Sequence, residues 1–146
     1  MAMQKLAQAA AGEALCETKY DFSSFVAQEP KHDAYETIAA IYIKGGRVCA
    51  LIVSRERDCQ WKARLQDIAE DKPWNAEELQ VHKRRAVDMI WVLKKSRRQG
   101  IAKCVVRVMA EHCKVSVESL AHLTPLSMDA INLWYSLKLT TIYLAH

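Results

Sequence analysis

A short apolar run, a basic turn, a glycine and an amphipathic segment, in that order, constrain this chain most. Residues 86–93 are apolar apart from Asp88, and basic residues bound the run on both sides. Such a run is too short for a typical helix and suits a buried strand. Gly100 follows shortly, and residues 101–113 then have a helical period. The order predicts a strand that leads through a basic turn to the start of a helix.

The predicted helix is amphipathic. Its apolar stripe is expected to comprise Ile101, Val105, Val108, Met109 and His112. The opposite stripe carries Lys103, Arg107, Glu111 and Lys114.

The start of this helix is a candidate phosphate site. The first turn of a helix leaves backbone N–H groups without partners and carries a partial positive charge. A glycine such as Gly100 lets a pyrophosphate approach the backbone closely. Arg97, Arg98 and Lys103 add positive charge at the same place. The glycine patterns of dinucleotide folds and nucleotide hydrolases do not occur.

The charge distribution agrees with a phosphate-bearing partner. The net charge of the chain is +4, yet residues 83–107 contain nine Lys or Arg and one acid, Asp88. A local basic stretch favours an anionic partner. For Lys83-Arg84-Arg85 alone, a solvated charged face is the better interpretation.

The rest of the chain predicts a mixed α/β domain. Residues 1–35 are expected to be helical or irregular, with a helix over the Ala-rich residues 7–11 and a break at Pro30. Residues 37–43 and 48–53 are β-type runs on either side of Lys44-Gly45-Gly46-Arg47, which predicts a hairpin. The polar stretch up to about Arg85 is expected to hold a short helix and a long loop.

The C-terminal third predicts strand, helix and strand. Residues 120–123 form a short β run that ends at Thr124-Pro125. Ser127 is a plausible N-cap, with Asp129 in the first helical turn. Residues 140–144 close the chain as a strand. One face of the helix is expected to carry Ala130, Leu133, Trp134 and Leu137.

Composition excludes several classes of protein. With 146 residues, 51% hydrophobic and 26% charged, the chain is expected to form one globular domain. No apolar run is long enough to cross a bilayer, and the N-terminus lacks the pattern of a secretion signal. The five cysteines are odd in number and match no zinc spacing. We therefore expect an intracellular protein with reduced thiols and no metal.

Residues 97–102 resemble the acetyl-CoA loop of the GNAT superfamily of N-acetyltransferases, which reads Arg-x-x-Gly-x-Ala between a strand and a helix. A closer resemblance, over about residues 38–144, is to the catalytic domain of the cohesin acetyltransferases (the Eco/ESCO family), without its zinc finger. The residues that carry it are Val48-Cys49-Ala50-Leu51-Ile52, Ile90-Trp91-Val92, Arg97-Arg98-Gln99-Gly100-Ile101-Ala102, Ser116, Glu118, Leu120, Ala121, Pro125 and Ile142-Tyr143-Leu144.

The resemblance implies a single α/β domain over residues 1–146 with a GNAT fold, in which helices flank a mixed, mostly antiparallel sheet. Residues 83–113 would form the acetyl-CoA strand, loop and helix. The implied co-substrate is acetyl-CoA, and the implied partner is a protein lysine, for example on a cohesin-type subunit in the nucleus. Without that partner, the cytoplasm is expected. The implied cofactor-binding residues are Ile90, Trp91, Val92, Arg97, Arg98, Gln99, Gly100, Ile101, Ala102 and Lys103.

Three residues are candidates for catalysis. Asp88 stands where the family commonly has Ser, and burial in a strand would suit it to act as a base. The alternative is a carboxylate that pairs with Arg84 or Arg85, or that caps a backbone group. Asp129 is a candidate for contacting the acceptor, or a dipole partner of its helix. Tyr135 is a candidate donor to the leaving thiolate.

Other residues near these candidates have structural interpretations. Tyr143 is a second possible donor, and either tyrosine could be packing. Trp134 is better explained by packing, and His122 as a core or surface histidine.

Competing functions remain open at this point. The chain could be a GNAT enzyme that acts on another lysine or a small amine. It could also be a non-catalytic acetyl-CoA-binding protein. A nucleic-acid-binding module ranks last, because no recognisable motif or interleaved aromatic residues accompany the basic stretch. We expect no membrane association and no direct nucleic-acid binding.

Overall fold

The structure, a computed structural model, describes residues 37–146. Within them, the chain forms two compact units. Unit 1 contains residues 37–54 and Met89–Met109, and unit 2 contains Arg55–Asp88 and Ala110–His146. The helix expected over residues 7–11 and the break expected at Pro30 lie outside the described residues.

Five strands pair in the order β1-β2-β3-β4-β5, with an additional pairing of β2 to β5. The strands are β1 (Ile38–Lys44), β2 (Arg47–Arg64), β3 (Glu77–Val92), β4 (Ala121–Leu123) and β5 (Thr141–Ala145). The α-helices are α3 (Leu65–Ala69), α4 (Ile101–His112) and α5 (Met128–Ser136). This is the mixed sheet flanked by helices that the sequence predicts, and the prediction is confirmed.

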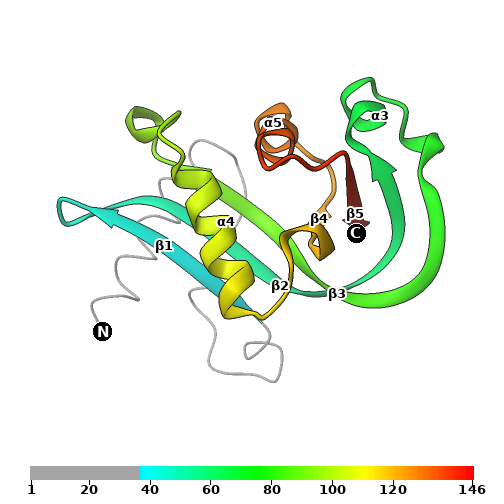
Figure 1. The fold of residues 1–146 in the computed structure, drawn as a ribbon, viewed down its shortest axis with the longest axis horizontal. Coiled ribbons are helices and arrows are strands. Elements are labelled where there is room, and N and C mark those ends of the chain that lie inside the picture. The colour runs from blue at the N-terminus through cyan, green and yellow to red at the C-terminus, as the bar shows by residue number, and fades with distance from the viewer. Residues whose placement is uncertain (1–36) are drawn as a thin grey trace. The chain divides into compact units, whose positions relative to one another are not determined.

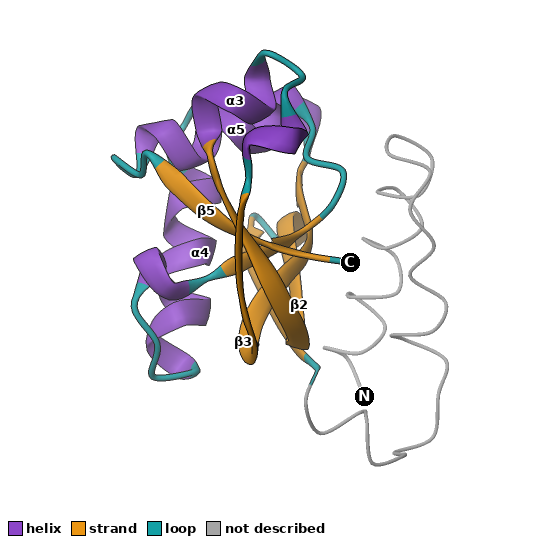
Figure 2. Cartoon of the chain, turned by 90° about the vertical axis from the view of Figure 1, so that its right-hand side faces the viewer, coloured by secondary structure: helices purple, strands orange, loops and turns teal. Residues whose placement is uncertain are grey.

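Unit 1 contains the predicted hairpin. β1 pairs antiparallel with β2 from Ile38↔Ser54 to Lys44↔Arg47, with an irregularity between Tyr42 and Ile43. Gly45 and Gly46 both have positive φ, as a tight hairpin turn requires. α4 lies across one face of the strands of this unit (Figures 1 and 2).

The core of unit 1 lies around Trp91, which is 2% exposed. The neighbours packed in the same cluster are Val48, Leu51, Val53 and Leu93, with the half-buried Ala39, Ile41 and Met89 around them. The N–H of Leu93 also donates to the carbonyl of Cys49 at 2.7 Å, so the end of β3 is held to β2 beyond the last residue of the strand.

The predicted stripe on α4 needs a correction. Val108 is 52% exposed and His112 is also exposed. The buried side chains are those of Ile101, Val105, Val106, Met109 and Ala110. The predicted stripe was wrong at two positions. In a short helix of mixed composition, more than one face is apolar enough to be buried, and the residues that pack against the helix determine which face it is.

Unit 2 contains the C-terminal half of β2, β3 up to Asp88, and the strands β4 and β5. β2 pairs antiparallel with β5 from Cys59↔Ala145 to Arg64↔Thr141. β3 pairs parallel with β4 at Ala86↔Ala121 and Val87↔His122, and β4 pairs parallel with β5. α3 and α5 contact each other, as Figure 2 shows.

The long loop predicted between the hairpin and Ala86 is wrong, although the short helix within it is present as α3. β2 continues to Arg64 and β3 begins at Glu77, so both strands extend far into the polar stretch. Half-buried Arg55 and Arg57 alternate with exposed Glu56 and Asp58, which is the period of a strand. That alternation was the available signal, and it was missed because both faces carry charged residues.

Two further properties concern the described residues as a whole. None of their helices has the length and apolar character needed to cross a membrane. Cys49, Cys59, Cys104 and Cys113 are all free thiols.

Candidate functional site

The loop between β3 and α4 takes the conformation that the glycine pattern predicts. A 3-10 turn at Lys94–Ser96 follows β3. Arg98 and Gly100 then both have positive φ, 63° and 77°. A methyl group placed on Gly100 would meet nothing within 4 Å, so the space beside this glycine is open. The loop therefore exposes its backbone at the point where the helix begins.

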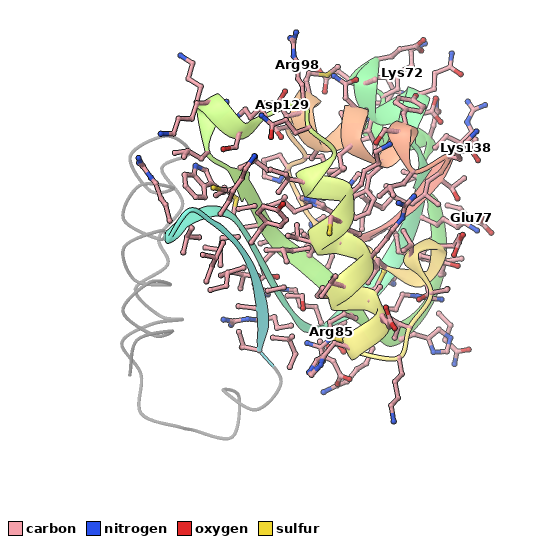
Figure 3. The ribbon with its side chains drawn as sticks, turned by 60° about the vertical axis from the view of Figure 1, so that its left-hand side comes forward. Lys72, Glu77, Arg85, Arg98, Asp129 and Lys138 are labelled. Atoms are coloured by element: carbon pink, nitrogen blue, oxygen red, sulfur yellow. The ribbon has the colours of Figure 1, made fainter. Side chains whose placement is uncertain are left out.

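The start of α4 has the electrostatics of an anion site. The first intrahelical bond runs from the N–H of Cys104 to the carbonyl of Gly100, at 3.1 Å. Residues 101–103 lie in the first turn, where the helix offers their N–H groups no acceptor. Arg98 is exposed and its side chain extends outward from the loop (Figure 3). Arg97 Nε instead donates to the Val92 carbonyl at 2.9 Å, which fastens the loop to the end of β3.

The other predicted cofactor residues divide by exposure. Trp91 and Ile101 are buried and serve packing, whereas Ile90, Val92, Ala102 and Lys103 are half-buried. Gln99 is exposed. Along β3, Trp91 faces the core of unit 1, so Ile90 and Val92 face the opposite side of the strand.

β3 is longer than its pairing with β4. The parallel register ends at Val87↔His122, while β3 continues to Val92. The β4-side edge of residues 88–92 therefore lies outside this pairing, and an unpaired sheet edge is where an added extended chain can pair.

Asp88 is a buried carboxylate held by two arginines of β2. Its side chain has no exposed surface. Arg57 Nε donates to Oδ1 at 2.7 Å, and Arg57 Nη2 donates to Oδ2 at 2.8 Å. Arg55 Nε lies 3.3 Å from Oδ2 without the alignment of a hydrogen bond. Because Arg55 and Arg57 are two residues apart in one strand, they share a face, and Asp88 binds both.

The predicted alternative partners of Asp88 are wrong. Arg84 stacks on the ring of Tyr143, 3.6 Å from its centroid, and donates to the Ser119 carbonyl at 3.4 Å. Arg85 instead lies 4.0 Å from a carboxylate oxygen of Glu56. The sequence alone pointed to near neighbours, and the sheet brought residues 31 positions away to the carboxylate.

The candidates on α5 are exposed. The Ser127 side chain accepts from the N–H of Ala130 at 3.1 Å, which confirms the predicted N-cap. Asp129 lies in the first turn and is exposed, and Tyr135 is 43% exposed. Trp134, next to Tyr135, is completely buried, and its Nε1–H has no partner within the described part of the chain. The Tyr143 ring is occupied by Arg84 on its face and by Lys62 at 5.2 Å.

His122 is a buried polar residue to which the sequence assigned only a structural interpretation. It lies in β4, is 6% exposed, and meets the Trp134 ring edge-on at 5.9 Å. Burial lowers its pKa, against the smaller opposing effects of its bond to Leu123 and of the Asp88 charge. The residues next to His122 in the sequence do not predict its burial, because a three-residue strand is too short to show an alternation of buried and exposed positions.

No cluster of three metal-binding side chains occurs in the part of the chain that the structure describes. Asp88, His122, Asp129, Tyr135 and Trp134 all belong to unit 2, whereas the loop and the start of α4 belong to unit 1.

Comparison with solved structures identifies the fold. The xEco2 acetyltransferase domain bound to a K105-CoA conjugate matches with a TM-score of 0.69 at 14% identity, over 99% of this chain and 85% of that chain. The chain has a GNAT acetyltransferase fold. Other solved structures with this fold include the ribosomal-protein-alanine N-acetyltransferase from Brucella melitensis biovar Abortus 2308, with a TM-score of 0.55 at 17% identity, over 90% of this chain and 84% of that chain. An aminoglycoside acetyltransferase from an uncultured soil metagenomic sample gives 0.53 at 18% identity, over 92% and 81%.

The comparisons of sequence give no match: no protein-family model and no curated protein matches this chain. The GNAT fold is thus supported by three-dimensional similarity, at identities that leave activity and substrate to be argued from the residues of the chain.

Proposed function

We propose that this chain is an acetyl-CoA-dependent N-acetyltransferase that acetylates a protein lysine. The observation that carries the proposal is the start of α4. There the positive φ of Gly100, the open space beside it and the first-turn N–H groups form a cradle for a pyrophosphate. Arg98 would add a charge-assisted contact, and the basic residues around it would attract the anion.

The edge of β3 extends this site along the chain. Acetyl-CoA carries an extended amide-containing arm between its pyrophosphate and its thioester. β3 runs from Ile90 to Val92 past the end of its pairing with β4, and the Val92 carbonyl there accepts from Arg97 Nε. We propose that the extended arm lies along this edge of β3. The residues present therefore fit both the charged and the extended part of the co-substrate.

When bound, acetyl-CoA supplies a thioester whose carbonyl carbon an uncharged amine attacks. The chain must hold the amine and remove its proton. Asp129 is proposed to attract the positively charged acceptor, since its carboxylate is exposed on α5. Tyr135 is proposed as a donor to the leaving thiolate. Asp88 stays a candidate for the catalytic apparatus, and its bidentate bond to Arg57 favours a role through its charge.

The lysine acceptor is the finer part of the proposal. Its support is that the xEco2 domain, with a TM-score of 0.69, was solved with a K105-CoA conjugate. A cohesin-type subunit is the acceptor that we propose to test first, and a nuclear location would follow from that acceptor.

Calorimetric titration with acetyl-CoA tests the cofactor proposal. We expect saturable binding, together with a rise in Tm that grows with ligand concentration. Gly100→Glu should abolish both, because it places a negative side chain in the open space of the cradle. Gly46→Glu is the matched control, since Gly46 also has positive φ but lies in the β1–β2 turn. If acetyl-CoA does not bind to the unchanged chain, the cofactor proposal is wrong.

A thiol-release assay tests the acceptor. The unchanged chain would be offered acetyl-CoA with a cohesin-type lysine peptide, the same peptide with Lys replaced by Arg, a peptide with a free N-terminal amine, a polyamine and an aminoglycoside. We expect release with the lysine peptide alone. Faster thiol release with the polyamine or the aminoglycoside would show that the acceptor is a small amine. Binding of acetyl-CoA without thiol release in the presence of any of these amines would indicate a non-catalytic binding protein.

A further inference from the structure

The N-terminal half of β3 is an exposed edge of the sheet in unit 2. β3 begins at Glu77, but its parallel pairing with β4 is confined to Ala86↔Ala121 and Val87↔His122. Its other neighbour in the sheet is β2, so among residues 37–146 no strand pairs with residues 77–85 on the β4 side. In Figure 1 this half of β3 follows the outer side of the C-terminal half of β2. Such an edge is a ready site for pairing with another strand.

The side chains along this edge are accessible on both faces of the strand. Residues 77–83 are exposed apart from the half-buried Leu79, and Val81 is 51% exposed. Glu77 extends away from the ribbon in Figure 3. Within the described part of the chain, neither Glu77 nor Lys83 takes part in an ion pair. An exposed valine therefore lies between an acid and a base that both lack a partner of opposite charge.

The order of these side chains is self-complementary. Alternate residues of a strand share a face, and one face here carries an acid, two apolar residues and a base, in the order Glu77, Leu79, Val81, Lys83. A second copy that runs antiparallel presents the same four residues in reverse. Each Glu77 then lies opposite a Lys83, and each Leu79 lies opposite a Val81. Charges on an edge strand commonly discourage pairing, but opposite signs at its two ends favour a reversed copy.

The other face of the strand agrees with the same register. It carries Glu78, Gln80 and His82. When Glu77 lies opposite Lys83, the two copies of Gln80 lie opposite each other, and Glu78 lies opposite His82. An acid thus faces a basic group or an amide faces an amide at every polar position of the register centred on Gln80.

The register centred on Val81 instead is less favourable. It places the apolar Leu79 opposite the charged Lys83. Its ionic pairs would also need arginines that are already engaged, since Arg84 stacks on the Tyr143 ring at 3.6 Å from the centroid.

We propose that two copies of this chain form an antiparallel dimer through residues 77–83 of β3, with the two-fold axis at Gln80. Backbone pairing continues the sheet of one copy into that of the other, and the two Glu77–Lys83 pairs fix direction and register. So short a strand buries less surface than a standard interface, so we expect a weak dimer, with a Kd of roughly micromolar to millimolar. The dimer does not depend on the proposed function.

Zero-length crosslinking of the unchanged chain tests the contact directly. A carbodiimide joins a carboxylate to an amine that touches it. Within one copy, the extended strand separates Glu77 from Lys83 by roughly 20 Å, so a crosslink between them forms only between copies. We expect mass mapping of the covalent dimer to find this crosslink at a chain concentration of about 1 mM, the upper end of the expected Kd. Its absence at that concentration overturns the proposal.

Charge reversal with sedimentation velocity tests the register. Glu77→Lys and Lys83→Glu should each raise the Kd of the dimer by about 10- to 100-fold, because two attractive pairs become repulsive. An equal mixture of these two variants should form a heterodimer, since every pair is then attractive. The double variant Glu77→Lys/Lys83→Glu should dimerise like the unchanged chain. Glu111→Lys, at an exposed position of α4, is the matched control and should leave the Kd unchanged.

The stability of each variant separates a lost contact from a lost fold. Both positions are exposed, so Tm should stay within the error of the unchanged chain. If a charge reversal lowers Tm, Glu77→Gln and Lys83→Gln replace it, and each should weaken the dimer less than the reversal. Dimerisation of either single reversal at the Kd of the unchanged chain overturns the proposal. So does failure of both the mixture and the double variant to restore the dimer.

Discussion

Both carboxylate oxygens of Asp88 accept hydrogen bonds from the guanidinium of Arg57, at 2.7 and 2.8 Å. The pair joins β2 to β3 within unit 2, and the Asp88 side chain has no exposed surface. Arg55 lies near the same carboxylate at 3.3 Å without a hydrogen bond. The carboxylate thus depends on Arg57 far more than on Arg55.

This asymmetry predicts unequal costs of losing the two arginines. Arg57→Met should lower the free energy of unfolding by about 3 kcal/mol, because it leaves a buried carboxylate without its bidentate partner. Arg55→Met should cost less than about 1 kcal/mol. Arg57→Lys should lower the free energy of unfolding by an intermediate amount, since it keeps the positive charge but loses the bidentate geometry of the guanidinium. Urea unfolding measures all three, and equal costs for the two Met variants would contradict the assignment.

His122 predicts a pH dependence of stability. Because burial lowers its pKa in the folded state, the unfolded chain binds the proton more tightly. Its contribution is therefore present above the ordinary value of 6.5 and is lost as the pH falls through the lower folded value. The free energy of unfolding, measured with urea between pH 5 and 8, should decline toward low pH more steeply in the unchanged chain than in His122→Gln. Parallel curves would show that His122 does not titrate differently on folding.

Gly100 predicts a loss of ligand binding that exceeds its effect on stability. Gly100→Ala should destabilise by roughly 1 kcal/mol, because an L-residue at φ of 77° is strained although the space is open. Gly46→Ala, at φ of 74°, should cost a similar amount. Only the change at Gly100 should weaken the affinity for acetyl-CoA in calorimetry. Equal affinities of the two variants would argue against a phosphate site at α4.

The thiols predict an order of reactivity. Cys59 is 2% exposed, donates to the Leu144 carbonyl at 3.1 Å, and has a pKa raised by burial, so it should resist alkylation in the folded chain. Among the thiols of residues 37–146, Cys104 is exposed on α4 and should react well before Cys59. A time course with N-ethylmaleimide and peptide mass mapping identifies each site, and Cys104→Ser should remove the fast labelling of the α4 peptide. Labelling of Cys59 before Cys104 would contradict the burial described for β2.

Much of the backbone geometry between β3 and α4 was predictable from the sequence. A glycine with positive φ, a basic turn and the start of a helix each depend on a few adjacent residues. The sequence of those residues is therefore enough to predict them. The strand before Gly100, α4 itself and the Ser127 cap are each specified within a few neighbouring residues. The prediction was wrong where charges occupy both faces of a strand, as in Arg55–Asp58, because the hydrophobic period that identifies a strand is absent there.

The sequence by itself determined the order of elements and the position of the loop between β3 and α4, since backbone conformation at glycines, caps and apolar runs depends on short-range sterics. The tertiary structure decided which residues meet Asp88 and His122. Arg57 is 31 positions from Asp88, and Trp134 reaches His122 from another element. Burial and pairing over such separations follow from the pairing of strands and the packing of α5, which no local pattern encodes.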